Sequence, residues 1–251
     1  MLDIKMKDEK TSWQEWYEDN PRPRRKIIKR VNTLVYGVGV NDADYTVVIA
    51  EKIGSKQIQI YKCRYYMVWE SMLKRCYSLD WSGKYPTYEG LSVCEEFKTF
   101  SLFRMWMVNN KIKEGDNRLQ LDKDILYPAN RVYSPSTCAF VPQFINMTLN
   151  ICERSSGDMP KGVECYTLKS GEVRYKWTVH AASGVIRGSG LVCKWKAHRE
   201  WQLARASVID AAIEKYKLMN CYREDVSVAV RARADKLRYD ESLGLETTRL
   251  P

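Results

Sequence analysis

Two acidic residues, a lysine and an asparagine lie close together in residues 121–146, between two apolar runs. Asp122, Lys123 and Asp124 follow directly on the first run, and Asn130 belongs to the same polar stretch. Acid and base groups presented together on one loop can hold a cation or a phosphate. The alternative is an exposed turn that binds no ligand, and these residues by themselves favour that alternative.

The elements on either side of this loop determine how its side chains are presented. The short run 119–121 is typical of a strand, and the apolar run 138–141 predicts a second strand. A helix is expected over 143–149, directly after it. Strand, loop, strand and helix in this order would place the acid and base groups on a hairpin that a helix supports.

Composition and charge limit the class of protein only loosely. The 251 residues suit one large or two small domains. The formal charge of +10 favours a polyanionic partner, of which nucleic acid is the commonest, although many proteins are mildly basic. No apolar run approaches the roughly 20 residues that span a bilayer, and the N-terminus lacks the apolar segment of a secretory signal. We therefore expect a cytoplasmic protein with no membrane partner.

The spacing of the cysteines and the small number of histidines do not fit a zinc site. None of the eight cysteines forms a C-x-x-C pair, and the only histidines are His180 and His198. Zinc fingers and ribbons need closely spaced ligand pairs, so no zinc is expected. The cysteines are expected to be reduced and mostly buried thiols.

Residues 1–30 are expected to form a flexible basic arm. Two prolines interrupt any helix there, and Arg24, Arg25 and Lys26 concentrate positive charge. Such arms often lie along DNA phosphates. A solvated linker is an equally good interpretation.

The region 31–150 combines β-structure with two amphipathic helices. Apolar residues recur every three to four positions in both helical patterns, which predicts a core-facing side for each. Expected strands cover 31–40, 45–50 and 57–62, and expected helices cover 63–78 and 93–110.

A second domain is expected over 151–220. The pattern predicts three strands over 159–163, 171–179 and 184–195, joined by Ser-Gly turns and followed by a long helix over 197–219. The last region, 221–251, is expected to begin with a solvated surface helix that ends at about residue 240.

Several ordered motifs in residues 34–146 carry a family resemblance. They are 35–45, VYGVGVNDADY; 66–77, YMVWESMLKRCY; 86–88, PTY; 93–100, VCEEFKTF; and 121–146, LDKDILYPANRVYSPSTCAFVPQFIN. Together they resemble the degenerate HNH-type, homing-endonuclease-like proteins of bacteriophages. The resemblance implies an α+β protein with a ββα-metal-like core that binds double-stranded DNA in the host cell cytoplasm.

The same resemblance implies roles for the polar loop. Asp122 stands where the family binds its divalent cation, for which Mg²⁺ or Mn²⁺ suits oxygen ligands. Lys123 stands where the family has a histidine general base, and a lysine is mostly protonated at neutral pH. A serine and a threonine replace the family's later asparagine, so Asn130 or Asp124 would have to complete the site.

The expected sheet and helix of region 151–220 resemble the AP2-type DNA-binding module. Alternation predicts Trp177 in the core against Trp201, with Arg174 and Lys176 on the outer face. The resemblance implies that the module's basic residues contact DNA, and ordinary solubilising charge is nearly as good an interpretation. The expected nucleic-acid-binding residues of the module are Lys161, Arg174, Lys176 and Arg187.

These observations leave three functions open. The first is a divergent, metal-dependent DNA endonuclease or nickase in which Asp122, Lys123 and Asp124 are catalytic and Asp122 and Asn130 bind metal. The second is a catalytically inactive DNA-binding protein on the same scaffold. The third is a protein that interacts with a host factor.

Overall fold

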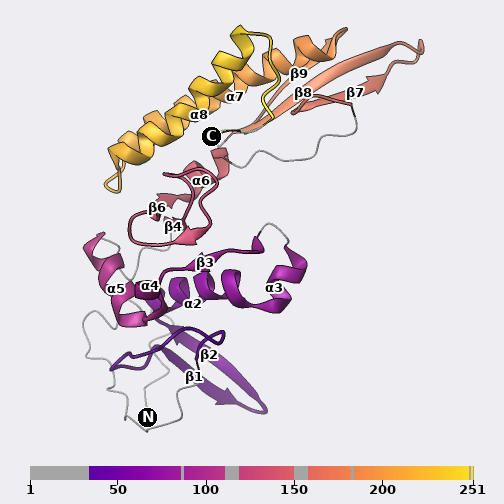
Figure 1. Cartoon of the computed structure of the whole chain (residues 1–251). Coiled ribbons are helices and arrows are strands. Elements are labelled where there is room, and N and C mark those ends of the chain that lie inside the picture. The colour runs from indigo at the N-terminus through magenta and orange to yellow at the C-terminus, as the bar shows by residue number, and fades with distance from the viewer. Residues whose placement is uncertain are drawn as a thin grey trace. The chain divides into compact units, whose positions relative to one another are not determined.

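The computed structural model of the chain describes residues 34–85, 88–110, 119–149, 158–181, 184–248 and 250 (Figure 1). The expected basic arm, with Arg24, Arg25 and Lys26, lies outside the described residues. The chain divides into two compact units, one of Met1–Arg118 with Arg131–Cys138 and one of Leu119–Asn130 with Ala139–Pro251. The described part mixes helices and strands, which confirms the expected α+β class. No helix in it is long and apolar enough to cross a membrane.

The first unit begins with a hairpin that leads into a long helix. Strand β1 (Val48–Ile53) pairs antiparallel with β2 (Lys56–Lys62), and helix α2 (Arg64–Tyr77) follows. A short helix α3 (Leu79–Lys84) comes next. Strands β1 and β2 and helix α2 agree with the expected strands and first helix to within three residues at each end, whereas α3 was not predicted.

The expected strand over 31–40 is wrong in its described part. Residues 35–39 form a tight turn in which Val35 pairs with Gly39, and Tyr36 and Gly37 have positive φ angles of 51° and 77°. A Cβ on Gly39 would lie 2.3 Å from a side-chain atom of Leu73, so the turn lies directly on α2. The β-branched residues of this segment therefore belong to a turn that packs on a helix, and not to a strand of a sheet.

The expected single helix over 93–110 is also wrong. It is divided into strand β3 (Ser92–Val93), helix α4 (Glu95–Lys98) and helix α5 (Phe100–Asn109). The interruption lies at Thr99, where the backbone of Val40 donates to Lys98 O and accepts from Phe100 N. Those hydrogen bonds use backbone groups that a continuous helix would need.

An aromatic core holds the first unit together. Trp69, Phe97, Phe100 and Phe103 are fully buried, as the apolar stripes predicted. The indole N–H of Trp69 donates to the carbonyl of Phe97 at 2.7 Å. Strand β3 pairs in parallel with the two-residue strand β5 (Val132–Tyr133) beside this core.

The second unit starts with the strands that flank the polar loop. Strand β4 (Leu119–Asp122) pairs antiparallel with β6 (Ala139–Pro142), and helix α6 (Gln143–Leu149) follows immediately. All three elements confirm their predictions to within a residue at each end. Strand β6 is buried along its whole length, and Ile145 of α6 joins the same core.

A three-stranded antiparallel sheet and a long helix form the centre of this unit. Strands β7 (Val163–Thr167), β8 (Val173–Ala181) and β9 (Gly184–Leu191) pair in that order, and α7 (Lys194–Lys217) packs on the sheet. The expected first strand at 159–163 is wrong, because residues 160–163 form a turn closed by a hydrogen bond from Val163 N to Pro160 O.

The predicted alternation along β8 is confirmed. Trp177 and Val179 are buried in the same core as Trp201 of α7, whereas the flanking Arg174 and Lys176 are only partly buried. A Cβ on Gly188 of the neighbouring strand would lie 2.3 Å from the Trp177 ring, so a glycine is needed there.

The expected C-terminal helix is confirmed as α8 (Glu224–Ser242), but the helix is not solvated on all sides, because it packs against α7. One face of α8 is fully buried, with apolar residues at helical spacing. These residues are Val226, Val230, Ala234 and Leu237.

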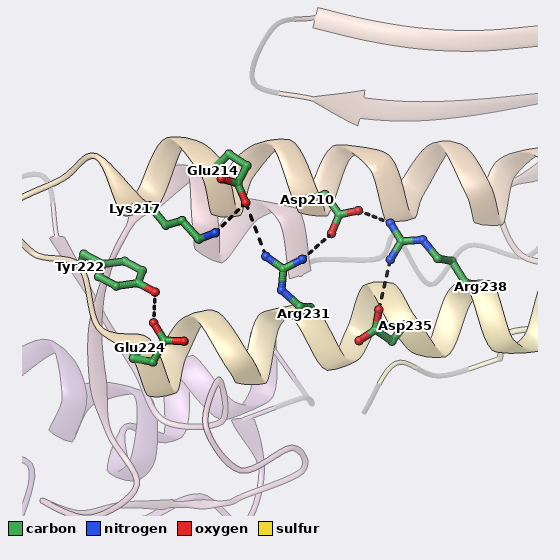
Figure 2. A network of polar contacts seen from close by, with 8 residues as sticks. All are labelled: Asp210, Glu214, Lys217, Tyr222, Glu224, Arg231, Asp235 and Arg238. Atoms are coloured by element: carbon green, nitrogen blue, oxygen red, sulfur yellow. Dashed lines mark hydrogen bonds and ion pairs between the residues drawn. The ribbon is translucent and has the colours of Figure 1, made fainter.

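Ion pairs join the two helices on their outer side (Figure 2). Arg231 of α8 lies 3.6 Å from Asp210 and 3.5 Å from Glu214 of α7. Arg238 contacts Asp210 and also Asp235 on its own helix. The apolar face and this network together fix the position of α8.

The cysteines are less buried than predicted. Among the seven described cysteines, only Cys63 and Cys138 are buried, and Cys165 and Cys193 are exposed.

Candidate functional site

The polar loop is positioned by the end of β4 and by one buried side chain. Leu119 and Leu121 are buried on one side of β4, and Asp122 ends the strand opposite Ala139 of β6. Three residues on, Ile125 is almost fully buried in the core of the second unit. The chain must therefore turn sharply between Asp122 and Ile125.

Asp122 forms that turn. Its Oδ1 accepts the backbone N–H of Asp124 at 2.9 Å and that of Ile125 at 2.7 Å. A short carboxylate that accepts backbone N–H groups two and three residues ahead is a common way to stabilise a tight turn. One oxygen of Asp122 therefore has a structural role.

The other predicted residues are gathered on the same loop. Lys123 Nζ donates to Asp124 Oδ2 at 2.8 Å, and the Lys123 side chain is only 14% exposed. Asn130 Nδ2 donates to the carbonyl of Lys123 at 2.7 Å. The structure thus brings together all four predicted residues, with Lys123 acting as the cationic partner of Asp124.

Arg233 of α8 is a further residue of the site, and it was not among the predicted site residues. Its guanidinium donates to the carbonyls of Ile125 at 2.9 Å, Asp124 at 3.3 Å and Ala229 at 2.9 Å. It is buried. The available signal was an arginine at a core-facing position of a helix, three residues after Val230 and four before Leu237.

The carboxyl of Asp122 is electrostatically unusual. Burial, the nearby charge of Asp124 and a hydrogen bond between the two carboxyl groups raise its pKa to about 6, against the opposing effect of the two backbone N–H donors. Burial lowers the pKa of Arg233, while both carboxylates raise it. A partly buried carboxyl with a strongly shifted pKa beside a second carboxyl is typical of functional sites.

The donor set of this loop fits a hard divalent cation and does not fit zinc. Asp122 and Asp124 offer carboxylate oxygens, which Mg²⁺ and Mn²⁺ prefer. Within the described ranges, no group of three or more histidine, cysteine, aspartate or glutamate side chains is placed to hold a metal. A cation bound here would have to keep several water ligands, as Mg²⁺ commonly does.

Neither histidine of the chain belongs to the loop. His180 lies on β8, and His198 lies in α7 with its ring fully buried. His198 Nδ1 lies 2.8 Å from the carbonyl of Lys161, and its Nε2 accepts the backbone N–H of Thr247 at 3.1 Å. This arrangement requires a neutral ring with its proton on Nδ1, and it joins the C-terminal segment to the start of the sheet.

Acidification should therefore weaken the second unit through His198. Burial lowers its pKa below the usual value, so below about pH 6.5 the unfolded chain binds a proton that the folded chain does not. The stability that the neutral ring provides is present above that pH and is lost as pH falls toward the folded-state pKa. Urea unfolding of wild type and His198→Gln between pH 8 and 5 should give curves that converge at low pH; parallel curves would contradict this role.

The predicted nucleic-acid-binding residues of the sheet differ in their surroundings. Lys161 Nζ donates to the carbonyl of Thr248, which ties it to the C-terminal segment. Arg174 and Lys176 lie on the outer face, paired with Glu172 at 2.8 Å and Glu164 at 3.0 Å. Arg187 is exposed opposite Thr178 and makes no ion pair within the described residues.

Comparisons of the chain with protein-family models, with curated proteins and with solved structures found no match.

Proposed function

We propose that this chain is a DNA-binding protein of the phage HNH type and a divergent metal-dependent endonuclease or nickase. The observation that carries the proposal is the pairing of the Asp122 and Asp124 carboxyl groups directly after β4. The antiparallel strands β4 and β6 with α6 behind them have the order of a ββα-metal core. In that arrangement the two carboxyl groups are presented where the family resemblance expects a cation.

The two carboxylates would hold Mg²⁺ or Mn²⁺. Their mutual repulsion, which contributes to the raised pKa of Asp122, would be relieved by a divalent cation. Such a cation stabilises charge on a scissile phosphate and its leaving oxygen. Asn130 keeps the loop in shape through the carbonyl of Lys123, and the Lys123 ammonium compensates the charge of Asp124.

DNA would be held by the outer face of the three-stranded sheet, in an AP2-like manner. Arg174, Lys176 and Arg187 share that face with Thr178. Arginine on a strand can reach guanine edges or phosphates, and lysine holds phosphates. Glu172 and Glu164 partner two of these cations, so Arg187 is the cation of this face with no acidic competitor among the described residues.

A catalytically inactive DNA-binding protein is the second candidate. It is favoured by the two backbone N–H groups that already occupy Oδ1 of Asp122, and by the absence of either histidine from the loop. The lysine in place of the family's general base is hydrogen-bonded to Asp124, which suits charge compensation better than proton abstraction.

A supercoiled-plasmid assay separates the two candidates. We expect wild type to nick the plasmid with Mg²⁺ or Mn²⁺ but not in EDTA, and we expect Asp122→Ala to lose nicking by at least about a hundredfold, as loss of a metal ligand does. Asp158→Ala, which removes an exposed carboxyl outside the loop, is the matched control. Plasmid binding without nicking, equal in all three proteins, would establish the inactive candidate.

A further inference from the structure

The far end of the β1–β2 hairpin is exposed on both of its faces. Val47 and Tyr61 are buried at its base, but every residue from 54 to 59 is exposed among the described residues. Figure 1 shows the hairpin extending away from α2 within the first unit. An isolated two-stranded hairpin is at best marginally stable, and the far end of this one packs on no core of the described residues, which favours a partner there.

The base of the hairpin is held to α2. Cys63 N donates to the carbonyl of Val47 at 2.8 Å, and the Lys62 ammonium pairs with Glu70 of α2. At the far end, Ile53 pairs with Lys56 across a two-residue turn that Gly54 opens with a φ of 64°. Such tight turns match the twist of the flanking strands and keep the two strands in register.

One face of the hairpin is polar and exposed. Lys52 lies opposite Gln57, and Ala50 lies opposite Gln59. Directly opposed residues of antiparallel strands project to the same side, so Lys52, Gln57 and Gln59 share one face. All three are exposed, and none makes a hydrogen bond or ion pair within the described residues.

We propose that this hairpin is a second DNA-contacting element, which enters the major groove with its Lys52–Gln57–Gln59 face. The inference rests on the proposed function, because it takes double-stranded DNA as the partner. A two-stranded ribbon fits the major groove, which is about 12 Å wide. Glutamine can form paired hydrogen bonds with adenine, and lysine contacts guanine or phosphate.

Charge and polarity favour DNA over a protein partner. Lys52 is the charged side chain of the proposed face among the described residues, whereas Lys56 and Glu51 lie on the opposite face and offset each other. The exposed apolar side chain Ile58 lies on the opposite face, beside Glu51. A face made of a cation and two amides offers little apolar area for a protein partner but matches base edges and phosphates.

The test is selection of duplexes from a random-sequence pool by the full chain, followed by titrations of the enriched duplex at several salt concentrations. Gln57→Ala/Gln59→Ala should lose preference at adjacent base pairs by about tenfold while keeping the salt slope. Lys52→Gln should weaken binding to all duplexes and reduce the salt slope by about 1. Glu51→Gln, on the opposite face, is the matched control and should preserve the selected sequence.

The outcomes separate this inference from the proposed function. If wild type binds no duplex, both fail. If wild type binds and the hairpin variants select the same sequence with the same affinity, while Arg187→Gln weakens binding, the hairpin inference alone is overturned. Self-association that disappears in the hairpin variants without any change in DNA binding would also overturn it, because the face would then serve a second copy of the chain.

Discussion

Replacing Asp122 by asparagine should make the second unit more stable at pH 8 while removing metal-dependent nicking. The asparagine Oδ1 can still accept the N–H groups of Asp124 and Ile125, and the amide can donate to Asp124. What disappears is a partly buried negative charge beside another carboxylate. A pKa raised from 3.8 to about 6 corresponds to about 3 kcal/mol of stabilisation in the variant at high pH.

The pH dependence of the added stability of Asp122→Asn identifies the Asp122 charge as its cause. The folded protein holds a proton on Asp122 up to about pH 6, whereas the unfolded chain releases it near pH 4. The free energy of unfolding of wild type therefore falls relative to that of the variant as pH rises from about 4 to 6. Above that range the difference between the two proteins is fully present. Below about pH 4 both proteins carry a neutral side chain and should be equally stable.

Urea unfolding in EDTA at pH 4 and pH 8 measures this difference without interference from metal. Asp158→Asn, which neutralises an exposed carboxylate, should change stability by less than about 0.5 kcal/mol at either pH. An Asp122→Asn variant that is less stable than wild type at pH 8 would mean that the charge is needed for the turn. The carboxyl would then be a structural residue of an ordinary loop.

Replacing Arg233 by methionine should destabilise the second unit by about 3 kcal/mol. The change leaves the carbonyls of Asp124 and Ile125 without their buried donor and removes the cation that faces both carboxylates. Methionine keeps much of the volume of the side chain, so packing loss is a minor part of the effect. The pKa of Asp122 should rise further, because an opposite charge no longer stabilises its ionised form.

Arg231→Met is the matched control, since Arg231 lies on the same helix but pairs with Asp210 at 3.6 Å and with Glu214 at 3.5 Å on the outer side (Figure 2). Arg231→Met should lower the stability of the second unit by less than about 1 kcal/mol. Thermal unfolding of the two variants side by side measures both losses of stability. Equal losses of stability in both variants would show that Arg233 does not hold the loop.

Local patterns in the sequence were sufficient for the elements around the loop. The alternation of Leu119 and Leu121, the apolar run of β6 and the helix that follows are all encoded within a few residues of one another. The loop itself was predictable for the same reason, because its four polar residues are close in sequence. Alternation along β8 likewise placed Trp177 inside and Arg174 outside.

Distant contacts determine the features that local sequence patterns do not predict. The interruption at Thr99 depends on hydrogen bonds to Val40, and no pattern within 93–110 reveals them. Arg233 lies 108 residues from Ile125, whose carbonyl it binds. The raised pKa of Asp122 depends on burial in the folded unit. Neither the support of the site nor its electrostatics could therefore be predicted from residue types and spacing.

A manganese titration tests the central claim most directly, because Mn²⁺ can be counted by isothermal calorimetry and by the paramagnetic signal of the free ion. The pairing of Asp122 with Asp124 predicts one saturable Mn²⁺ per chain at pH 8, weakened at least about tenfold in both Asp122→Asn and Asp124→Asn and unchanged in Asp158→Asn. Binding should also weaken below pH 6, as a proton competes for Asp122. No saturable binding, or binding that both loop variants retain, would contradict a metal site at this loop.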